Sequence, residues 1–414
     1  MHRRFVVLVL AASLLLASCG GDDGGEETTP EDATTTGASA IGGADGSTTQ
    51  PAEVVGPPTT RGPAPTVSVE PVGALGGMTV LSGEPLYRGV LGQIDPERNI
   101  VAPVALPPAT AAAGIAPLTG LAVADPSVLE RPAMIVKIDN TNKGRPQEAL
   151  AAADMIYEEM IEGGFTRLAV VYHSQAPEVV GPVRSGRTTD IALIESLNVP
   201  VFVWSGANLV HASLLRRHDM VDLGAQSRSE YSRAADRPGT YNLMTDAVEL
   251  YELAAGRENG GTPSPHFEYR DETIGLPDTA EPAAGVTVSF PSVTAEWAWD
   301  EDLAGWVRAQ DGTPHIDAQD VPVVAANVVV AEVRQVRTGS VDTAGSPVFE
   351  QQFVGSGRGW VFTDGHVIEV TWTKPSLRSV ATWTTADGVP VALTPGLTWI
   401  ELAPEDGVTL SEVL

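Results

Sequence analysis

Cysteine is nearly absent from this 414-residue sequence, which holds one, Cys19. A lone cysteine forms no internal disulfide and supplies no set of thiolate ligands, so both are excluded as supports of the fold. Positive charge is also scarce, because the sequence has 25 Lys and Arg residues and 53 Asp and Glu residues, which gives a net charge of −28. A chain this acidic lacks the basic surface that nucleic acids and anionic lipids attract, so we predict no nucleic-acid partner.

Sequence motifs for common cofactors are missing as well. The histidines are scattered and form no His-x-x-x-His or His-Glu-x-x-His pattern, which argues against a dedicated zinc site. There is no calcium loop, no phosphate-cradling glycine loop and no dinucleotide fingerprint, and Ser185 lacks the Gly-x-Ser-x-Gly pattern of a nucleophile elbow. We therefore predict no metal and no cofactor.

The N-terminal residues have the pattern of an export signal. Arg3 and Arg4 precede an almost wholly apolar run, residues 5–16, which is shorter than the about 20 residues that span a bilayer. The residues that follow, Leu16-Ala17-Ser18-Cys19, match the lipobox of bacterial lipoproteins. We predict that Cys19 carries a diacylglycerol, which makes the membrane a partner and places the protein at the outer face of the plasma membrane. The alternative is a cleaved signal with an incidental cysteine.

Composition divides the rest of the chain into three parts. Residues 20–111 form an acidic stretch rich in Pro, Gly and Thr, which cannot bury enough apolar surface to offset its ordering entropy, so we predict a disordered linker after the signal peptide, residues 1–19. Residues 112–270 mix strand and helix patterns and predict a mixed α/β domain. Residues 271–414 predict a β-rich domain, either separate or packed as a second layer on the first.

The first folded part alternates apolar strand-like runs with helical spacing. We predict strands over 133–138, 167–172 and 199–204, and helices over 189–197, 209–217 and 245–255, the last with Thr245 as N-cap. Residues 154–163 are ambiguous between strand and helix, and Gly163-Gly164 predicts a hairpin turn after them.

The second folded part consists of short β-type runs separated by turn residues. The runs are 286–290, 296–299, 305–309, 321–324, 327–333, 349–354, 359–362, 367–372 and 397–402. Seven tryptophans fall in this half, and we interpret them as core packing, with sugar stacking as the alternative. The overall fold class is α+β, a mixed sheet with helices followed by a β-rich part.

The densest group of polar residues lies between positions 139 and 187. The most specific pattern in this group is residues 181–187, where two arginines flank a serine and a glycine just before a predicted helix. The planar guanidinium of arginine can donate two parallel hydrogen bonds to the two oxygens of a carboxylate or phosphate group, so we predict an anion-binding site. Its candidate residues are Arg145, Arg167, Arg184, Ser185 and Arg187. The alternative is internal ion pairing, with Arg184 and Arg187 held by Glu158, Glu162 or Asp139.

Carboxylates of the same stretch are candidates for acid–base chemistry. Asp139, Glu158 and Glu162 could each transfer a proton, and Asn140 is a further polar candidate beside them. Metal binding would require three or more oxygens to converge, which spacing alone does not show.

The chain resembles the YerB-like lipoprotein family, a family of unknown function in Gram-positive bacteria, over about residues 115–403. The resemblance implies a mixed α/β part, a β-rich part and a lipid anchor, but no activity. One departure is at Thr240-Tyr241-Asn242, where relatives are expected to have a His before the Asn. The stretches that carry the resemblance are Pro117-Leu-Thr-Gly-Leu121, Lys137-Ile-Asp-Asn140, Arg145-Pro-Gln147, Ala153-Asp-Met-Ile-Tyr-Glu158, Glu162-Gly-Gly-Phe-Thr-Arg167, Pro177-Glu-Val-Val-Gly-Pro-Val-Arg-Ser-Gly-Arg187, Gly312-Thr-Pro-His-Ile-Asp317, Asn327-Val-Val-Val330 and Pro395-Gly-Leu-Thr-Trp399.

Three functional hypotheses follow from these features. The first is a non-enzymatic envelope protein that binds an anionic or sugar-containing wall polymer, or an envelope protein, through its arginines. The second is a wall-modifying hydrolase or transferase that uses a carboxylate with the arginine cluster. The third is a purely structural interaction protein, in which the polar cluster only holds the fold together.

Overall fold

The computed structural model describes residues 114–225, 228–257, 260–271, 273–342 and 345–411, together with four two-residue strands before them. Those strands are β1 (Ala74–Leu75), which pairs with β2 (Met78–Thr79), and β3 (Tyr87–Arg88), which pairs with β4 (Gln93–Ile94). The chain divides into a first unit, Met1–Pro65, and a second, Thr66–Leu414, which contains every described residue. The predicted signal peptide, Cys19 and nearly all of the predicted linker lie outside the described residues.

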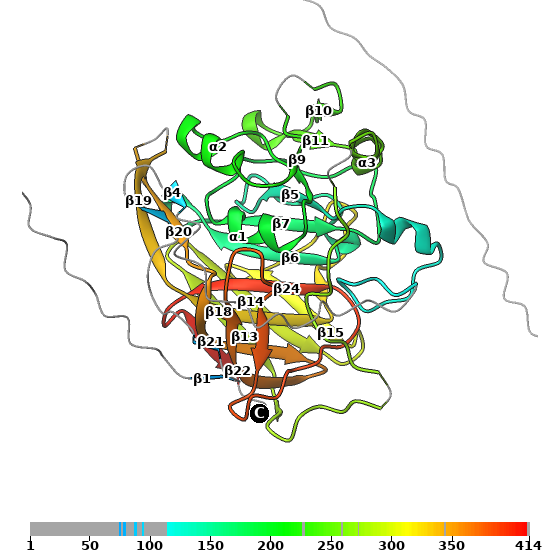
Figure 1. Ribbon diagram of the computed structural model, residues 1–414, viewed down its shortest axis with the longest axis vertical. Helices are drawn as coiled ribbons and strands as arrows, with labels where there is room; N and C mark the ends of the chain where they lie inside the picture. The colour runs from blue at the N-terminus through cyan, green and yellow to red at the C-terminus, as the bar shows by residue number, and fades with distance from the viewer. Residues whose placement is uncertain are drawn as a thin grey trace, which may run out of the picture. The chain divides into compact units, whose positions relative to one another are not determined.

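A mixed sheet of eleven strands forms the centre of the second unit. Its order joins the two halves of the sequence, because β24 from the C-terminal half lies between β18 and β6 and runs parallel to both (Figure 1). The strands in order are β12 (Glu281–Pro282), β22 (His366–Lys374), β21 (Gly355–Thr363), β18 (Asn327–Val333), β24 (Thr398–Pro404), β6 (Met155–Met160), β7 (Thr166–Tyr172), β5 (Met134–Asp139), β8 (Val201–Val203) and β9 (Val221–Asp222), with β23 (Thr382–Thr384) pairing with β22.

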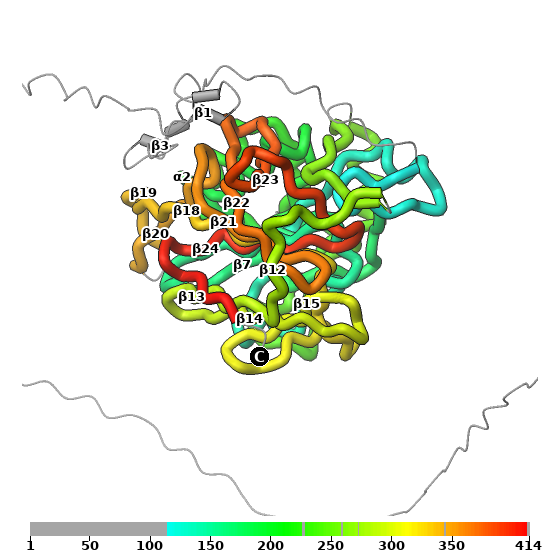
Figure 2. Tube along the Cα trace, turned by 90° about the horizontal axis from the view of Figure 1, so that it is seen from below, coloured from blue at the N-terminus to red at the C-terminus, as the bar shows by residue number. Residues whose placement is uncertain are grey.

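A second sheet of six strands packs against one face of the first. Its β13 and β14 lie beside β24 in the view of Figure 2, and Asp311-Gly312 makes the turn after β15, both residues having positive φ. The strands in order are β16 (Thr313–Pro314), β15 (Gly305–Gln310), β14 (Val293–Asp300), β13 (Gly285–Phe290) and β25 (Val408–Ser411), with β17 (Val324–Ala325) pairing with β15.

Three short α-helices cover the larger sheet. Helices α1 (Asp190–Ser196) and α2 (Leu209–Leu215) bury apolar side chains on one face, and α3 (Ala247–Ala255) packs on the other. Two hairpins lie outside the sheets, β10 (Tyr231–Arg233) with β11 (Leu243–Thr245), and β19 (Gln335–Val341) with β20 (Pro347–Gln351). The 3₁₀ turns are η2 (Pro126–Glu130), η3 (Leu150–Ala152), η4 (Glu162–Gly164) and η5 (Gly239–Tyr241). No helix among the described residues is long and apolar enough to cross a membrane.

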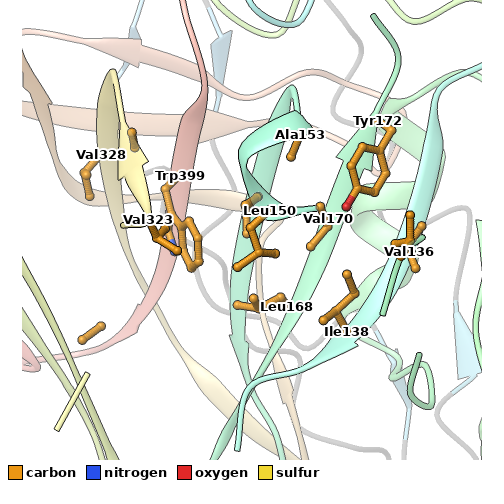
Figure 3. Close-up of a cluster of buried hydrophobic side chains, with 14 of the residues drawn as sticks. Val136, Ile138, Leu150, Ala153, Leu168, Val170, Tyr172, Val323, Val328 and Trp399 are labelled. Atoms are coloured by element: carbon orange, nitrogen blue, oxygen red, sulfur yellow. The ribbon is translucent and has the colours of Figure 1, made fainter. Parts of the chain in front are cut away.

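The alternation of side chains along the strands builds two apolar cores, one on each face of the large sheet. Val136, Ile138, Leu168 and Val170 point into the core shared with the smaller sheet, where Trp399 of β24 joins them (Figure 3). The other core contains the helices α1 and α2. Each large apolar side chain buried in this way contributes about 1.5–3 kcal/mol.

The predicted α+β fold class is confirmed, a mixed sheet with three helices and a β-rich C-terminal region. The ambiguous run 154–163 forms strand β6 over Met155–Met160, because β7 and β24 pair with it on both sides, and its last residues begin the 3₁₀ turn η4. The prediction of Thr245 as the N-cap of the third helix is wrong. Asp246 caps it by accepting hydrogen bonds from the backbone N of Val248 and Glu249, and Thr245 ends strand β11.

Candidate functional site

Three loops meet at one end of strand β5. Residues 139–148 follow the strand, residues 181–187 cross beside it, and residues 237–242 include η5; we call them the three-loop cluster. The backbone N of Asp139 donates to Pro182 O at 3.0 Å, and the backbone N of Arg184 donates to Lys137 O at 2.8 Å. The third loop is held by Arg237, whose Nη1 donates to Pro146 O at 2.7 Å. The predicted anion-binding loop is therefore fixed in place from both sides.

Arg184 connects all three loops. Its Nε lies 2.7 Å from Asp139 Oδ2, and its Nη1 donates to Thr240 O at 3.0 Å. Asp139 is almost fully buried, whereas the Arg184 side chain keeps 23 % of its surface exposed. The guanidinium carbon lies 5.1 Å from the centroid of the Tyr241 ring, and Lys143 Nζ lies 6.0 Å from the same centroid. Two cations thus flank one aromatic ring.

Gly144 makes the close approach of the first loop possible. A Cβ atom at this position would lie 2.4 Å from Asp139 Oδ1, well inside van der Waals contact. Asp139 Oδ1 is already occupied, because it accepts hydrogen bonds from the backbone N of Thr141 at 2.8 Å and from the Thr141 hydroxyl at 2.5 Å. The carboxylate that orients Arg184 is therefore itself fixed by its own loop.

Two further arginines of the region, Arg187 and Arg167, make their contacts inside the protein. Arg187 binds Glu162 through two parallel contacts, Nε to Oε1 at 2.7 Å and Nη2 to Oε2 at 2.5 Å. Arg167 is buried and donates from Nη1 to the backbone O of Ser185. Burial, and then repulsion from Arg187, lowers the pKa of Arg167 to about 9. Both side chains hold the loop rather than face solvent.

The side chains of Ser185 and Arg145 take no part in these contacts. The Ser185 hydroxyl faces the Ser205 hydroxyl at 3.4 Å, and no histidine, lysine or carboxylate of the described residues is bonded to it. Arg145 is half-buried and hydrogen-bonds Asn142 through Nη2, while its Nε has no hydrogen-bond partner. Burial, and then repulsion from Arg308, lowers the pKa of Arg145.

Glu158 and Asn140 belong to a different polar group, on the opposite face of the sheet. Asn140 Nδ2 donates to Glu158 Oε1 at 2.9 Å, and Glu158 Oε2 pairs with Arg308 Nη2 at 2.7 Å. Glu158 and Arg308 are fully buried. Glu401 sits directly beside Glu158 in the parallel pair of β24 with β6, and burial, followed by repulsion from Glu158, raises its pKa well above the ordinary value.

A third buried group joins β5, β6 and α1. Lys137 Nζ pairs with Glu159 and lies 2.7 Å from Asp190 Oδ1, and all three side chains are fully buried. Burial, and then repulsion from Asp190, raises the pKa of Glu159 to about 7. The predicted site residues are thus distributed over two faces of the sheet, because successive strand residues such as Glu158 and Glu159 point in opposite directions.

Several residues of these groups escaped the sequence reasoning. Arg308 and Glu401 lie in the second half of the chain and meet Glu158 only through sheet packing. Tyr241 was noted only as a departure from the family pattern. The tryptophans confirm the core interpretation, because Trp297, Trp306 and Trp399 are buried, and Trp297 Nε1 donates to Glu401. Among the described residues, no group of three or more His, Cys, Asp or Glu side chains could hold a metal ion.

Comparison with known proteins identifies the family. Residues 118–260 match the N-terminal domain of "Protein of unknown function (DUF3048)", and residues 286–400 match the C-terminal domain of the same family. The chain is 28% identical over 322 residues to "Putative lipoprotein YerB" of Bacillus subtilis, covering 72% of this chain and 88% of that protein. It is also similar to the crystal structure of the YerB protein from Bacillus subtilis, with a TM-score of 0.62 and 25% identity, covering 72% of this chain and 99% of the other.

The chain therefore belongs to the DUF3048 family and is a distant homologue of the B. subtilis protein. The two family matches coincide with strands from both halves of the large sheet, β5 to β9 in the first match and β18 to β22 in the second. Neither match assigns a function.

Proposed function

We propose that this member of the DUF3048 family is a lipid-anchored envelope protein, held by Cys19 at the outer face of the plasma membrane. Its folded unit would be a non-enzymatic binding module for an anionic or sugar-containing wall component, or for an envelope protein. The tether is supported by the run Leu16-Ala17-Ser18-Cys19 and by the name of the relative in Bacillus subtilis, "Putative lipoprotein YerB". Two acyl chains suffice for stable anchoring.

The binding role rests on the exposed edge of Arg184. In a chain of net charge −28, this guanidinium is oriented by a buried carboxylate and still keeps part of its surface open. A guanidinium that is held through Nε and Nη1 and keeps Nη2 free can donate to a carboxylate or phosphate oxygen at little entropic cost. Arg145 supplies a second, half-buried cation on the neighbouring loop.

The pairing of the acids favours binding over catalysis. Asp139 faces Arg184, Glu158 faces Arg308, and Glu162 is held by both nitrogens of Arg187. A general acid or base must reach a substrate proton, and a carboxylate that is buried against an arginine does not. A hydrolase or transferase role for these three carboxylates therefore has less support than binding.

Titration of the purified protein with soluble wall fragments tests the binding role. Arg184→Ala removes the exposed edge and should weaken binding by about tenfold or more, the value of one charge-assisted hydrogen bond. Arg217→Ala is the matched control, because Arg217 is an exposed arginine just beyond α2 with no ion pair. Equal affinity of the parent and the Arg184→Ala variant would reject the proposal.

The third hypothesis, a purely structural role, is favoured for part of the cluster. Arg167 donates a hydrogen bond to Ser185 O, and Arg187 donates hydrogen bonds to Gly186 O and to Glu162. For these two arginines, substitution should lower stability rather than binding. Melting temperatures measured beside each titration separate the two effects.

A further inference from the structure

The three-loop cluster gathers positive charge in an otherwise acidic protein. Its residues, 139–148, 181–187 and 237–242, contain five basic side chains against two acidic ones, and Glu162 adds a third acidic group as the partner of Arg187. The basic ones are Lys143, Arg145, Arg184, Arg187 and Arg237, and the acidic ones are Asp139 and Glu148. A local excess of this sign raises the concentration of anions at the surface, against the repulsion from the whole chain.

Three hydrogen-bond donors in this cluster have no hydrogen-bond partner among the described residues. Arg184 uses Nε toward Asp139 and Nη1 toward Thr240 O, which leaves Nη2 free. Lys143 is exposed, and its Nζ makes only the distant contact with the Tyr241 ring. The hydroxyl of Tyr241 is neither bonded to a described residue nor among the buried polar atoms that lack a partner. The donors come one from each loop.

The backbone around these donors is held in advance of any ligand. Tyr241 closes η5, where its backbone N donates to Pro238 O at 2.9 Å. Arg237 ties the same loop to the first one through Pro146 O and through Glu148 Oε1 at 3.0 Å. Preorganised donors lose little freedom when a ligand arrives, so most of their interaction energy appears as affinity.

We propose that Arg184, Lys143 and Tyr241 form a phosphate-binding site, which takes a phosphate group carried by a wall or lipid component. Three donors of different kinds from three loops suit the several oxygens of a tetrahedral phosphate better than the two coplanar oxygens of a carboxylate. The free Nη2 of Arg184 donates to one phosphate oxygen, and the Lys143 ammonium adds a point charge. The Tyr241 hydroxyl donates the remaining hydrogen bond. This inference rests on the proposed function and names the chemical class of its ligand.

Isothermal titration of the purified protein with inorganic phosphate, glycerol 1-phosphate and acetate provides the first test. Both phosphates should bind, acetate should bind at least about tenfold more weakly, and affinity should fall as salt is raised. Acetate affinity equal to that of phosphate, or no phosphate binding at low salt, would overturn the assignment. Glycerol 1-phosphate binding better than inorganic phosphate would point to a polyol phosphate polymer or a lipid headgroup as the source.

Two peripheral substitutions identify the residues without endangering the fold. Lys143→Ala removes an exposed ammonium, and Tyr241→Phe removes only a hydroxyl; each should weaken phosphate binding by about tenfold and leave the melting temperature unchanged. Arg217→Ala, which removes the same charge outside the three loops, should change affinity less than about twofold. Parent-like phosphate affinity in both cluster variants would reject the site.

The two proposals fail in different ways. If the affinity for wall fragments depends on Arg184 but not on Lys143 or Tyr241, the binding module is supported and the phosphate site is rejected. If the affinity for phosphate depends on all three residues but wall fragments do not bind, the phosphate site is supported and the wall component is rejected as the ligand.

Discussion

Arg187 is the residue whose substitution should cost the most stability in the loop. Its fork spans both oxygens of Glu162, and the two side chains are only 13% and 7% exposed. Arg187→Ala leaves Glu162 without its partner in a poorly solvated place, so we expect a loss of about 2–4 kcal/mol in the free energy of unfolding. Urea denaturation measures it.

An exposed ion pair of the same chemistry serves as the control for this prediction. Arg358 pairs with Glu369 through Nε at 2.9 Å, with more than half of each side chain exposed. Arg358→Ala should therefore cost less than about 1 kcal/mol, because solvent and salt screen the pair. Similar losses in the two variants would contradict the importance of burial for the Arg187 pair.

Ionisation of the buried Glu350 carboxyl should lower the free energy of unfolding as pH rises. Burial raises the pKa of Glu350 to about 8, against hydrogen bonds from Thr188 and Gln352 that lower it. The folded protein keeps this proton up to about pH 8, whereas the unfolded chain releases it near pH 4.5. The group's contribution is therefore complete at low pH and is lost as pH rises through that window.

Glu350→Gln keeps the shape and cannot ionise. Between pH 5 and 8 the free energy of unfolding of this variant should fall less steeply than that of the parent, by up to about 1.4 kcal/mol per pH unit. Denaturation curves at pH 5, 6.5 and 8 measure the slopes. Glu369→Gln, at an exposed position of β22, should keep the parent slope. Parallel slopes for Glu350→Gln and the parent would refute the prediction.

At the scale of elements, the loop after β5 depends on a glycine. Gly144→Ala places a methyl group 2.4 Å from Asp139 Oδ1, so either the loop or the carboxylate must move. We expect a loss of about 1–3 kcal/mol, and weaker anion binding because Asp139 no longer orients Arg184. Gly275→Ala is the control, since a Cβ there meets nothing within 4 Å. Unchanged stability and binding in Gly144→Ala would show that the contact is not required.

Element types were largely readable from the sequence. Residues 327–333 read as a strand because the apolar run is β-branched and bounded by turn residues, and they form β18 with the same limits. A strand was predicted over 321–324, but the strand that pairs with β15 is β17, Val324–Ala325. Whether such a short run forms a strand depends on its pairing partner, and a partner that is distant in sequence leaves no local signal.

At the scale of the whole molecule, the proposed lipid anchor would determine where the protein is found. Cys19→Ala removes the sulfur that would carry the diacylglycerol, so the protein should move from the membrane fraction to the soluble extracytoplasmic fraction. Fractionation of cells with immunoblotting measures the distribution. Ser18→Ala keeps a small residue before Cys19 and should leave the protein in the membrane fraction. Membrane retention of the Cys19→Ala variant would overturn the lipid anchor.

The sequence by itself determined the chemical character of the parts, because composition and spacing are local properties. It indicated the acidic linker, the lipobox at Cys19, the mixed sheet and the arginine-rich loop 181–187. The sequence left open whether Arg184 and Arg187 face solvent or pair with acids of the same chain, and the structure pairs Arg187 with Glu162 and Arg184 with Asp139.

Only the tertiary structure decided which acidic side chain pairs with which basic side chain. Glu158 and Glu159 are neighbours in sequence, yet one pairs with Arg308, 150 residues further along the chain, and the other with Lys137. The physical reason is that a strand sends successive side chains to opposite faces, and the partners on each face come from whichever elements the sheet order brings there. Arg184 and Lys143 likewise meet only at the ring of Tyr241, and the three residues come from three different loops.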